Sequence, residues 1–262
     1  RPPMTQPISC AYSVTGSGPP LILVHGIGAS RATWATALPL LEPHFTVIAY
    51  DLRGHGASPQ PEGRFGLDAL VADLEHVREQ AGVEAAHIAG HSLGGMIGPA
   101  YARAFPDRVL SLGLLSTAAF RTEKDSANVK AVVAAMRERG IADVLGTLAH
   151  RWFTDGFIAE HPEVIEARMA QVIGTNPEVF LNVFDIYAET EMAPWLHEIT
   201  ARSLVLTGEN DGGCPPRLNQ LIAEAMPFAT LRVLSGLKHS ILLEGGAQTG
   251  ACLRDFLLGL GD

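Results

Sequence analysis

The hexapeptide Gly90-His91-Ser92-Leu93-Gly94-Gly95 combines residues whose types and spacing suit nucleophilic chemistry. It sets a serine between two glycines in the pattern Gly-x-Ser-x-Gly, after the apolar run 85–89 and before a helix-like stretch that ends at Phe105. In that context the pattern predicts a reactive serine on a sharp turn between a strand and a helix. The pentapeptide alone leaves an alternative open, which is an ordinary glycine-rich turn.

The physics of such a turn explains both glycines. A serine in a strained turn brings its backbone close to its neighbours, so the positions two before and two after it must lack a Cβ. The turn lifts the hydroxyl above the edge of the sheet, and the helix N-terminus beneath it favours developing negative charge.

A serine hydroxyl also needs a general base, and that base needs an orienting partner. Asp211 lies in the loop after one predicted strand, and His239 lies in the loop after the next. The chain order serine, acid, histidine is the one that accompanies Gly-x-Ser-x-Gly. We therefore predict Ser92, Asp211 and His239 as catalytic residues, and we interpret Glu209 as a solvated or structural neighbour.

Backbone N–H groups are the natural donors to an oxyanion beside such a serine. We expect them from Leu93, which follows the nucleophile, and from Ile27 in the loop His25-Gly26-Ile27-Gly28. A phosphate cradle is the alternative for this loop. It lacks the Lys-Ser/Thr of a P-loop and the third glycine of a dinucleotide fingerprint, so nucleotide binding is disfavoured.

We interpret the other histidines beside the site as structural and not as catalytic. His25, His55 and His91 lie beside the predicted site, and we expect them to brace its loops by hydrogen bonds. The sequence has no H-E-x-x-H spacing and no carboxylate cluster, so we expect no metal.

Composition places the chain among globular proteins of one large domain. Its 262 residues are 47% hydrophobic and 18% charged, which suits a well-buried α/β domain with room for an insertion. The net charge of -9 and the lack of a Lys/Arg run argue against a nucleic-acid partner. No apolar run reaches the roughly 18 residues of a membrane span, so no membrane partner is expected.

The cysteines and the first residues bear on location. Cys10, Cys214 and Cys252 are odd in number and widely spaced, which favours reduced thiols and a cytoplasmic protein. Residues 1–4 have no apolar core, so we expect no signal peptide. The sequence does not predict the oligomeric state.

Strand and helix patterns alternate over most of the chain, which predicts a mostly parallel sheet with helices on both faces. The start is expected to form a short hairpin, in which residues 7–14 turn at 16–20 into the strand 21–24. The further strands are predicted at 45–50, 85–89, 109–115, 203–208 and 230–234. Helices are expected near 34–41, 67–80, 96–105, 217–226 and 249–260.

The alternation stops between residues 121 and 197, where only helical segments are predicted. These segments are Val129–Arg139, Ile141–Trp152, Pro162–Ile173 and Pro177–Ala188, and the two prolines suit a first helical turn. We interpret 121–197 as a helical cap, or lid, over the carboxyl edge of a core domain formed by 1–120 and 198–262.

Together these motifs resemble the α/β-hydrolase superfamily over essentially the whole chain. The resemblance implies that fold, with an all-helical cap inserted after the sixth strand. The matching stretches, in the family's order, are His25-Gly26-Ile27-Gly28, Asp51-Leu52-Arg53-Gly54-His55-Gly56-Ala57-Ser58, Gly90-His91-Ser92-Leu93-Gly94-Gly95, Gly208-x-x-Asp211 with Pro215, and Gly236-x-x-His239.

Within the superfamily, the chain departs from several branches. Haloalkane dehalogenases and epoxide hydrolases carry an aspartate where this chain has Ser92, and the carbon–carbon hydrolases of meta-cleavage pathways usually have asparagine where His91 stands. The chain is similar to 3-oxoadipate enol-lactonases in its serine hexapeptide and in Arg151-Trp152-Phe153-Thr154 of the cap. That resemblance implies hydrolysis of a small ester or lactone without a cofactor. It also implies possible substrate contacts from Arg151 and Trp152.

Other functions remain open at this point. The same three residues serve carbon–carbon bond hydrolases and perhydrolases, and some relatives with this fold are small-molecule receptors. A complete set of Ser92, Asp211 and His239 weighs against a pure receptor, because ligand binding does not require all three.

Overall fold

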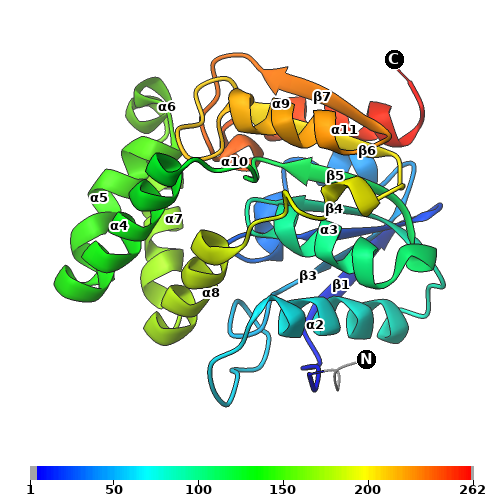
Figure 1. Cartoon of the computed structure of the whole chain (residues 1–262), viewed down its shortest axis with the longest axis horizontal. Helices are drawn as coiled ribbons and strands as arrows, with labels where there is room; N and C mark the ends of the chain where they lie inside the picture. Colours follow the sequence, from blue (N-terminus) through cyan, green and yellow to red (C-terminus); the bar gives the residue numbers. More distant parts are fainter. Residues whose placement is uncertain (1–4, 261–262) are drawn as a thin grey trace.

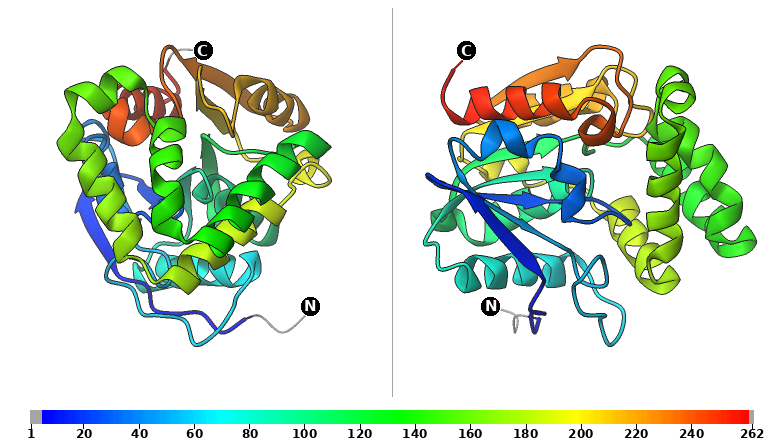
Figure 2. Two further views of the ribbon diagram at one scale, coloured as in Figure 1. Left: turned by 90° about the vertical axis from the view of Figure 1, so that its left-hand side faces the viewer. Right: turned by 180° about the vertical axis from the view of Figure 1, so that it is seen from behind.

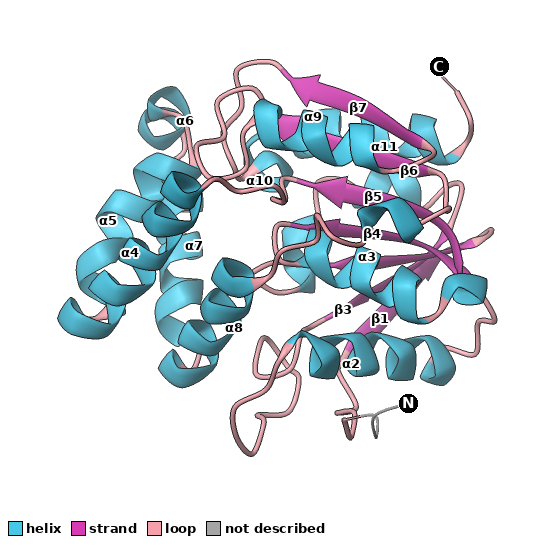
Figure 3. Cartoon of the chain, in the orientation of Figure 1, coloured by secondary structure: helices cyan, strands magenta, loops and turns pink. Residues whose placement is uncertain are grey.

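The strands of the computed structural model, which describes residues 5–260, form a seven-stranded sheet of order β1-β3-β2-β4-β5-β6-β7 (Figures 1 and 3). Every neighbouring pair is parallel except β1 with β3. The strands are β1 Tyr12–Gly16, β2 Pro20–Val24, β3 Thr46–Tyr50, β4 Ala86–His91, β5 Val109–Leu115, β6 Ser203–Gly208 and β7 Ala229–Leu234.

Helices cover both faces of the sheet, and each face has its own apolar core. On β2, Leu21 and Leu23 face one core while Ile22 and Val24 face the other, because successive side chains of a strand point to opposite faces. One core includes α2 (Leu67–Gln80), α3 (Gly94–Ala104) and α9 (Pro216–Ala225). The other includes η1 (Arg31–Trp34), α1 (Leu38–Leu41), α10 (Ile241–Glu244) and α11 (Gly246–Leu257).

The predicted hairpin between the first two strands is wrong. β1 pairs with β3, with Tyr12 opposite Tyr50, so β3 lies between β1 and β2. The turn after β1 crosses the segment that leads into β3, where the Ser17 N–H donates to the Glu42 carbonyl at 3.3 Å. A Cβ at Gly16 would overlap the backbone of that segment, and both Gly16 and Gly18 have positive φ. The glycines therefore serve a crossing of the chain, where a hairpin was expected.

Five helices lie between β5 and β6 and gather beyond the carboxyl ends of the strands, as the views in Figures 1 and 2 agree. We call this group the helical insertion. The insertion was expected after the sixth strand, but within residues 5–260 it follows the fifth strand, β5. The count differs by one because a single strand, β1, precedes β2. The members of the helical insertion are α4 Glu123–Arg139, α5 Ile141–Trp152, α6 Asp155–Glu160, α7 Pro162–Gly174 and α8 Pro177–Glu189.

Local sequence explains where these helices begin. Pro162 and Pro177 occupy first-turn positions, as predicted. α4 starts earlier than expected because Thr122 and Asp125 form a reciprocal capping box. α6 was not predicted, since six residues are too few to show a helical period.

Three further observations concern the expectations about location. Among residues 5–260, no helix is both long and apolar enough to cross a bilayer. Cys10, Cys214 and Cys252 are all free. Residues 1–4, on which the signal-peptide expectation depends, lie outside the described residues. The remaining short elements are the 3-10 turns η2 Pro106–Arg108 and η3 Leu196–Glu198.

Candidate active site

Ser92 lies in the tight turn between β4 and α3. Its φ is +58°, a left-handed conformation that non-glycine residues rarely adopt. A Cβ at Gly90 would overlap the Gly94 carbonyl oxygen, and one at Gly94 would overlap the Val24 carbonyl oxygen. The two flanking glycines are therefore required by close backbone contacts, as the Gly-x-Ser-x-Gly pattern predicts.

The structure brings Ser92, His239 and Asp211 together from three separate loops. The Ser92 hydroxyl lies 3.0 Å from His239 Nε2, and His239 Nδ1 lies 2.7 Å from Asp211 Oδ2. Glu209 does not take part, because its carboxylate accepts a hydrogen bond from the Gly236 N–H. The contacts form one continuous chain from hydroxyl to imidazole to carboxylate, which is an arrangement able to move a proton off the serine.

Backbone groups fix the Asp211 carboxylate. Its Oδ1 accepts hydrogen bonds from the N–H groups of Gly213, at 3.1 Å, and Cys214, at 2.7 Å. This leaves Oδ2 directed at His239. Burial opposes the charged imidazole, but the Asp211 charge and hydrogen bond outweigh it, so the pKa of His239 is raised above its ordinary value.

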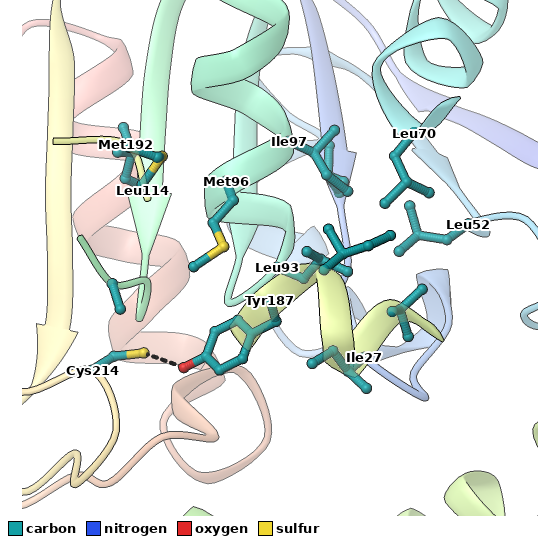
Figure 4. Close-up of a cluster of buried hydrophobic side chains, with 14 of the residues drawn as sticks. Ile27, Leu52, Leu70, Leu93, Met96, Ile97, Leu114, Tyr187, Met192 and Cys214 are labelled. Carbon is teal, nitrogen blue, oxygen red and sulfur yellow. Dashed lines mark hydrogen bonds between the residues drawn. The ribbon is translucent and has the colours of Figure 1, made fainter. Parts of the chain in front are cut away.

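A buried thiol completes the surroundings of this pair. Among the described residues, Asp211, Cys214 and His239 each bring one atom of a type that could bind a metal ion, and these three atoms lie within 4.8 Å of one another. The Cys214 sulfur also lies 3.0 Å from the Tyr187 hydroxyl of α8, a contact drawn in Figure 4. The aspartate and histidine atoms are already engaged with each other, so hydrogen bonding accounts for this cluster.

Two backbone N–H groups near the serine have no hydrogen-bond acceptor among residues 5–260. They belong to Ile27 and Leu93. Their side chains are buried in one apolar cluster (Figure 4), which anchors both turns from behind. The backbone N–H groups are thus left free to meet a ligand, as an oxyanion hole requires.

Two histidines hold the loop that contains Ile27. His25 Nε2 accepts the Leu52 N–H at 2.9 Å, so its Nδ1–H donates to the Gly26 carbonyl at 2.7 Å. His55 Nε2 accepts the Gly28 N–H at 3.0 Å. These contacts bear out the expectation that His25 and His55 brace the loops.

His91 braces the opposite loop by donating from Nε2 to the His239 carbonyl at 2.9 Å. All three bracing histidines are kept neutral mainly by burial. Burial lowers the pKa of His55 to about 4 and that of His91 to about 3, and it lowers the pKa of His25 well below its ordinary value. A neutral ring offers one donor and one acceptor, and His25 and His55 use both.

A cavity of about 360 Å³ opens above Ser92 between the sheet edge and the helical insertion. Its walls combine apolar and polar side chains in similar measure. The apolar lining includes Val129, Val132, Leu148, Trp152, Phe184 and Tyr187.

Both residues that the resemblance implied for substrate contact line this cavity. Trp152 lies in its wall, and Arg151 lines it while remaining exposed, with no ion pair among residues 5–260. Sequence reasoning missed two other arginines of the cavity. Arg121 lies over the Tyr187 ring at 4.6 Å, and Arg168 lies over the Trp152 ring at 4.9 Å. No local pattern distinguishes these two from surface arginines.

The helical insertion is tied to the loop that carries His239. The Ser240 N–H donates to the Trp152 carbonyl at 3.0 Å, and the Lys238 ammonium donates to the His150 carbonyl at 2.7 Å. Thr154 donates to Glu244 through both its N–H and its hydroxyl. The end of α5 therefore rests directly on the candidate site.

Comparison with known proteins identifies the family. The family described as alpha/beta hydrolase fold matches residues 19–155. The 3-oxoadipate enol-lactonase 2 of Acinetobacter baylyi is 30% identical over 231 residues, covering 87% of this chain and 86% of that protein. The chain therefore belongs to the α/β-hydrolase family, as its motifs predicted, and it is a hydrolase.

Solved structures agree over nearly the whole length. A hydrolase from Pseudomonas aeruginosa superposes with a TM-score of 0.86 at 29% identity, covering 95% of this chain and 94% of that one. A thermophilic esterase from Thermogutta terrifontis also gives a TM-score of 0.86, at 27% identity, covering 96% and 94%. The predicted likeness in fold is thereby confirmed.

Proposed function

We propose that this protein hydrolyses a small carboxylic ester or lactone through an acyl-enzyme intermediate. In this proposal Ser92 is the nucleophile, His239 the general base and Asp211 its orienting partner. The observation that carries it is the hydrogen-bonded chain of these three side chains, with two unassigned N–H groups beside the serine. The similarity to an enol-lactonase and an esterase supports the substrate class.

The first half of the proposed reaction acylates the serine. His239 Nε2 takes the proton from the Ser92 hydroxyl while Oγ attacks the carbonyl carbon. The N–H groups of Ile27 and Leu93 donate to the resulting oxyanion, and such donors are worth about 3–4 kcal/mol each in related chemistry. When the intermediate collapses, the bond to the leaving oxygen breaks and that oxygen takes the proton from His239. In a lactone the leaving alcohol remains tethered to the acyl group.

The second half releases the acid. His239 deprotonates a water molecule, whose oxygen attacks the acyl carbon and forms a second oxyanion. Collapse breaks the ester bond to Ser92, and the serine oxygen recovers its proton from His239. The net reaction consumes one water and yields one acid and one alcohol. These steps use the chain's own side chains and water.

The cavity supports a small substrate. Its volume of about 360 Å³ is near the low end of the roughly 300–1,000 Å³ typical of ligand sites. We propose that Trp152 forms part of the substrate-binding wall and that Arg151 contacts the substrate at the cavity mouth. We also propose that residues 121–197 act as a cap domain over a core of 1–120 and 198–262. A cytoplasmic location stays a prediction based on the free cysteines.

Hydrolysis of p-nitrophenyl acetate, p-nitrophenyl butyrate and an enol-lactone tests this function, with wild type and Ser92→Ala compared. We expect wild-type turnover and a kcat lower by roughly a million-fold in the variant, which is the order of the loss found when the serine nucleophile of another serine hydrolase is removed. Faster cleavage of the lactone than of the esters would favour a lactonase. Equal turnover in Ser92→Ala would refute the mechanism, and no wild-type turnover on any substrate would refute the ester or lactone class.

A further inference from the structure

The helical insertion contributes one cation to the loop that carries Ile27. From α7, the Arg168 guanidinium donates to the Gly28 carbonyl at 2.6 Å through Nη1 and to the Ile27 carbonyl at 2.9 Å through Nη2. Its plane lies over the Trp152 ring. Among residues 5–260 no carboxylate pairs with the guanidinium. Removal from water lowers the pKa of Arg168 to about 10, and no acidic neighbour offsets that effect. Arg168 is half-buried, and its Nη1 also donates to the Gln171 Oε1 at 3.3 Å. Shielding an arginine from water without an acidic partner is costly, so its two carbonyl contacts need a reason.

These contacts clamp the peptide groups that follow Ile27. The peptide between Ile27 and Gly28 is held at its carbonyl by Arg168 and at its N–H by His55. The next peptide is held at its carbonyl by Arg168, while its N–H, from Ala29, donates to the Gly26 carbonyl at 3.4 Å. A peptide plane held at both ends cannot rotate without losing a hydrogen bond.

The peptide before Ile27 differs in one respect. Its carbonyl, from Gly26, is held by His25, but its N–H has no partner among the described residues. This N–H is the one that the proposed reaction uses for the oxyanion. The peptide groups around Ile27 are therefore held by hydrogen bonds except at the Ile27 N–H, and one of the clamps comes from a helix some 140 residues away in the chain.

We propose that Arg168 is a positioning residue for the oxyanion hole, so that docking of α7 on the loop that contains Ile27 completes the site. The inference rests on the proposed function. The guanidinium fork holds the Ile27 and Gly28 carbonyls, and the rigid loop directs the Ile27 N–H toward the oxyanion. The positive charge of Arg168 contributes to lowering the pKa of His25 and of His55. The same charge favours a negative oxygen at this place.

The test separates positioning from substrate binding. Arg168→Met removes the fork and the charge, Arg168→Lys keeps a charge without the planar fork, and Glu166→Gln changes an exposed residue of the same helix as a control. With the neutral substrate p-nitrophenyl acetate, we expect kcat to fall about 10- to 100-fold in Arg168→Met while KM changes by less than about twofold. Arg168→Lys should lie between Arg168→Met and wild type.

Two further measurements report on the oxyanion hole itself. Phenylboronic acid forms a tetrahedral adduct with a reactive serine, so its inhibition constant should rise in parallel with the fall in kcat. Millimolar guanidinium chloride should restore part of the kcat of Arg168→Met, whereas equal concentrations of urea or sodium chloride should not. Circular dichroism melts check that each variant is folded, and rescue by guanidinium would itself demonstrate a folded site.

Several outcomes would overturn the inference. An active wild type with unchanged kcat and unchanged boronate inhibition in a folded Arg168→Met would refute it while leaving the proposed function intact. A loss confined to KM for carboxylate-bearing esters, with p-nitrophenyl acetate unaffected, would assign the guanidinium to substrate binding instead. If Arg168→Met is unfolded, wild-type kcat in Arg168→Lys refutes the clamp. No wild-type turnover would overturn both the proposed function and this inference.

Discussion

Replacing Asp211 by asparagine tests the proposed mechanism sharply, because the structure fixes how the amide must lie. In the wild type, Oδ1 accepts the N–H groups of Gly213 and Cys214, and Oδ2 faces His239 Nδ1. An asparagine amide has one oxygen, and the two backbone donors require it at the Oδ1 position. Its NH₂ group must therefore face His239.

That orientation imposes the wrong tautomer. An NH₂ group donates, so Nδ1 of His239 must become the acceptor and the ring proton moves to Nε2. Nε2–H then points at the Ser92 hydroxyl and cannot take its proton. The same exchange in a Ser-His-Asp protease lowers kcat about 10,000-fold. A tenfold change is about 1.4 kcal/mol, so we expect a loss of about 5 kcal/mol of transition-state stabilisation in Asp211→Asn.

The pH profile provides a second measure of the same substitution. A general base works only when neutral, so wild-type kcat/KM should rise as the pH passes upward through the pKa of His239. Asp211 holds that pKa above its ordinary value against the effect of burial. In Asp211→Asn the charge is lost and the burial remains, so the midpoint of the residual activity should move to lower pH.

Steady-state hydrolysis of p-nitrophenyl acetate between about pH 5 and 11 measures both effects, because the pKa of His239 is raised to about 10. Glu209→Gln is the matched control, since it removes the charge of a carboxylate in the same loop that accepts a hydrogen bond from the Gly236 N–H and not from His239 within residues 5–260. This control should keep wild-type kcat. An Asp211→Asn variant that is folded and within about tenfold of wild type would refute the proposed role of the carboxylate.

Two other predictions concern the serine turn and the bracing histidines. In Gly90→Ala the new Cβ would overlap the Gly94 carbonyl oxygen, so we expect kcat to fall by about 100-fold or more. Gly63→Ala, where a Cβ meets nothing within 4 Å, should have no effect, and a fully active Gly90→Ala would contradict the required turn. The three bracing histidines have lowered folded-state pKa values, so the unfolded chain binds more protons below pH 6.5. Urea unfolding should thus show a loss of about 1 kcal/mol per histidine between pH 6.5 and 5.5. An unchanged free energy of unfolding there would contradict their neutral state.

The sequence predicted those parts of the protein that short-range physics specifies. The Gly-x-Ser-x-Gly turn needs its glycines because of contacts within a few residues, so the motif alone located Ser92. The order of strands along the chain likewise indicated where Asp211 and His239 would lie. The partner of β1 could not be predicted in this way, because the glycines at 16 and 18 indicate a sharp turn without indicating which strand follows beside it.

Arg168 illustrates the same limit within the candidate site. Arg151 and Arg168 both lie on predicted helices, and nothing in their local sequence separates an arginine at the cavity mouth from one that holds the Ile27 loop. The difference arises where α7 crosses that loop, which is a contact between residues far apart in the chain. Only the packing of the helical insertion against that loop determines it.

That packing has a consequence for how the insertion can be exchanged or removed. Its residues hold two different loops, since Trp152 accepts from the N–H next to His239 and Arg168 donates to the Ile27 carbonyl. A lid that merely covered a complete site could be deleted with loss of substrate affinity alone. Here deletion would also release the loop that contains His239 and the loop that contains Ile27, so kcat should fall together with substrate affinity. A transplanted insertion from a relative would preserve kcat only if it supplied equivalent contacts to both loops.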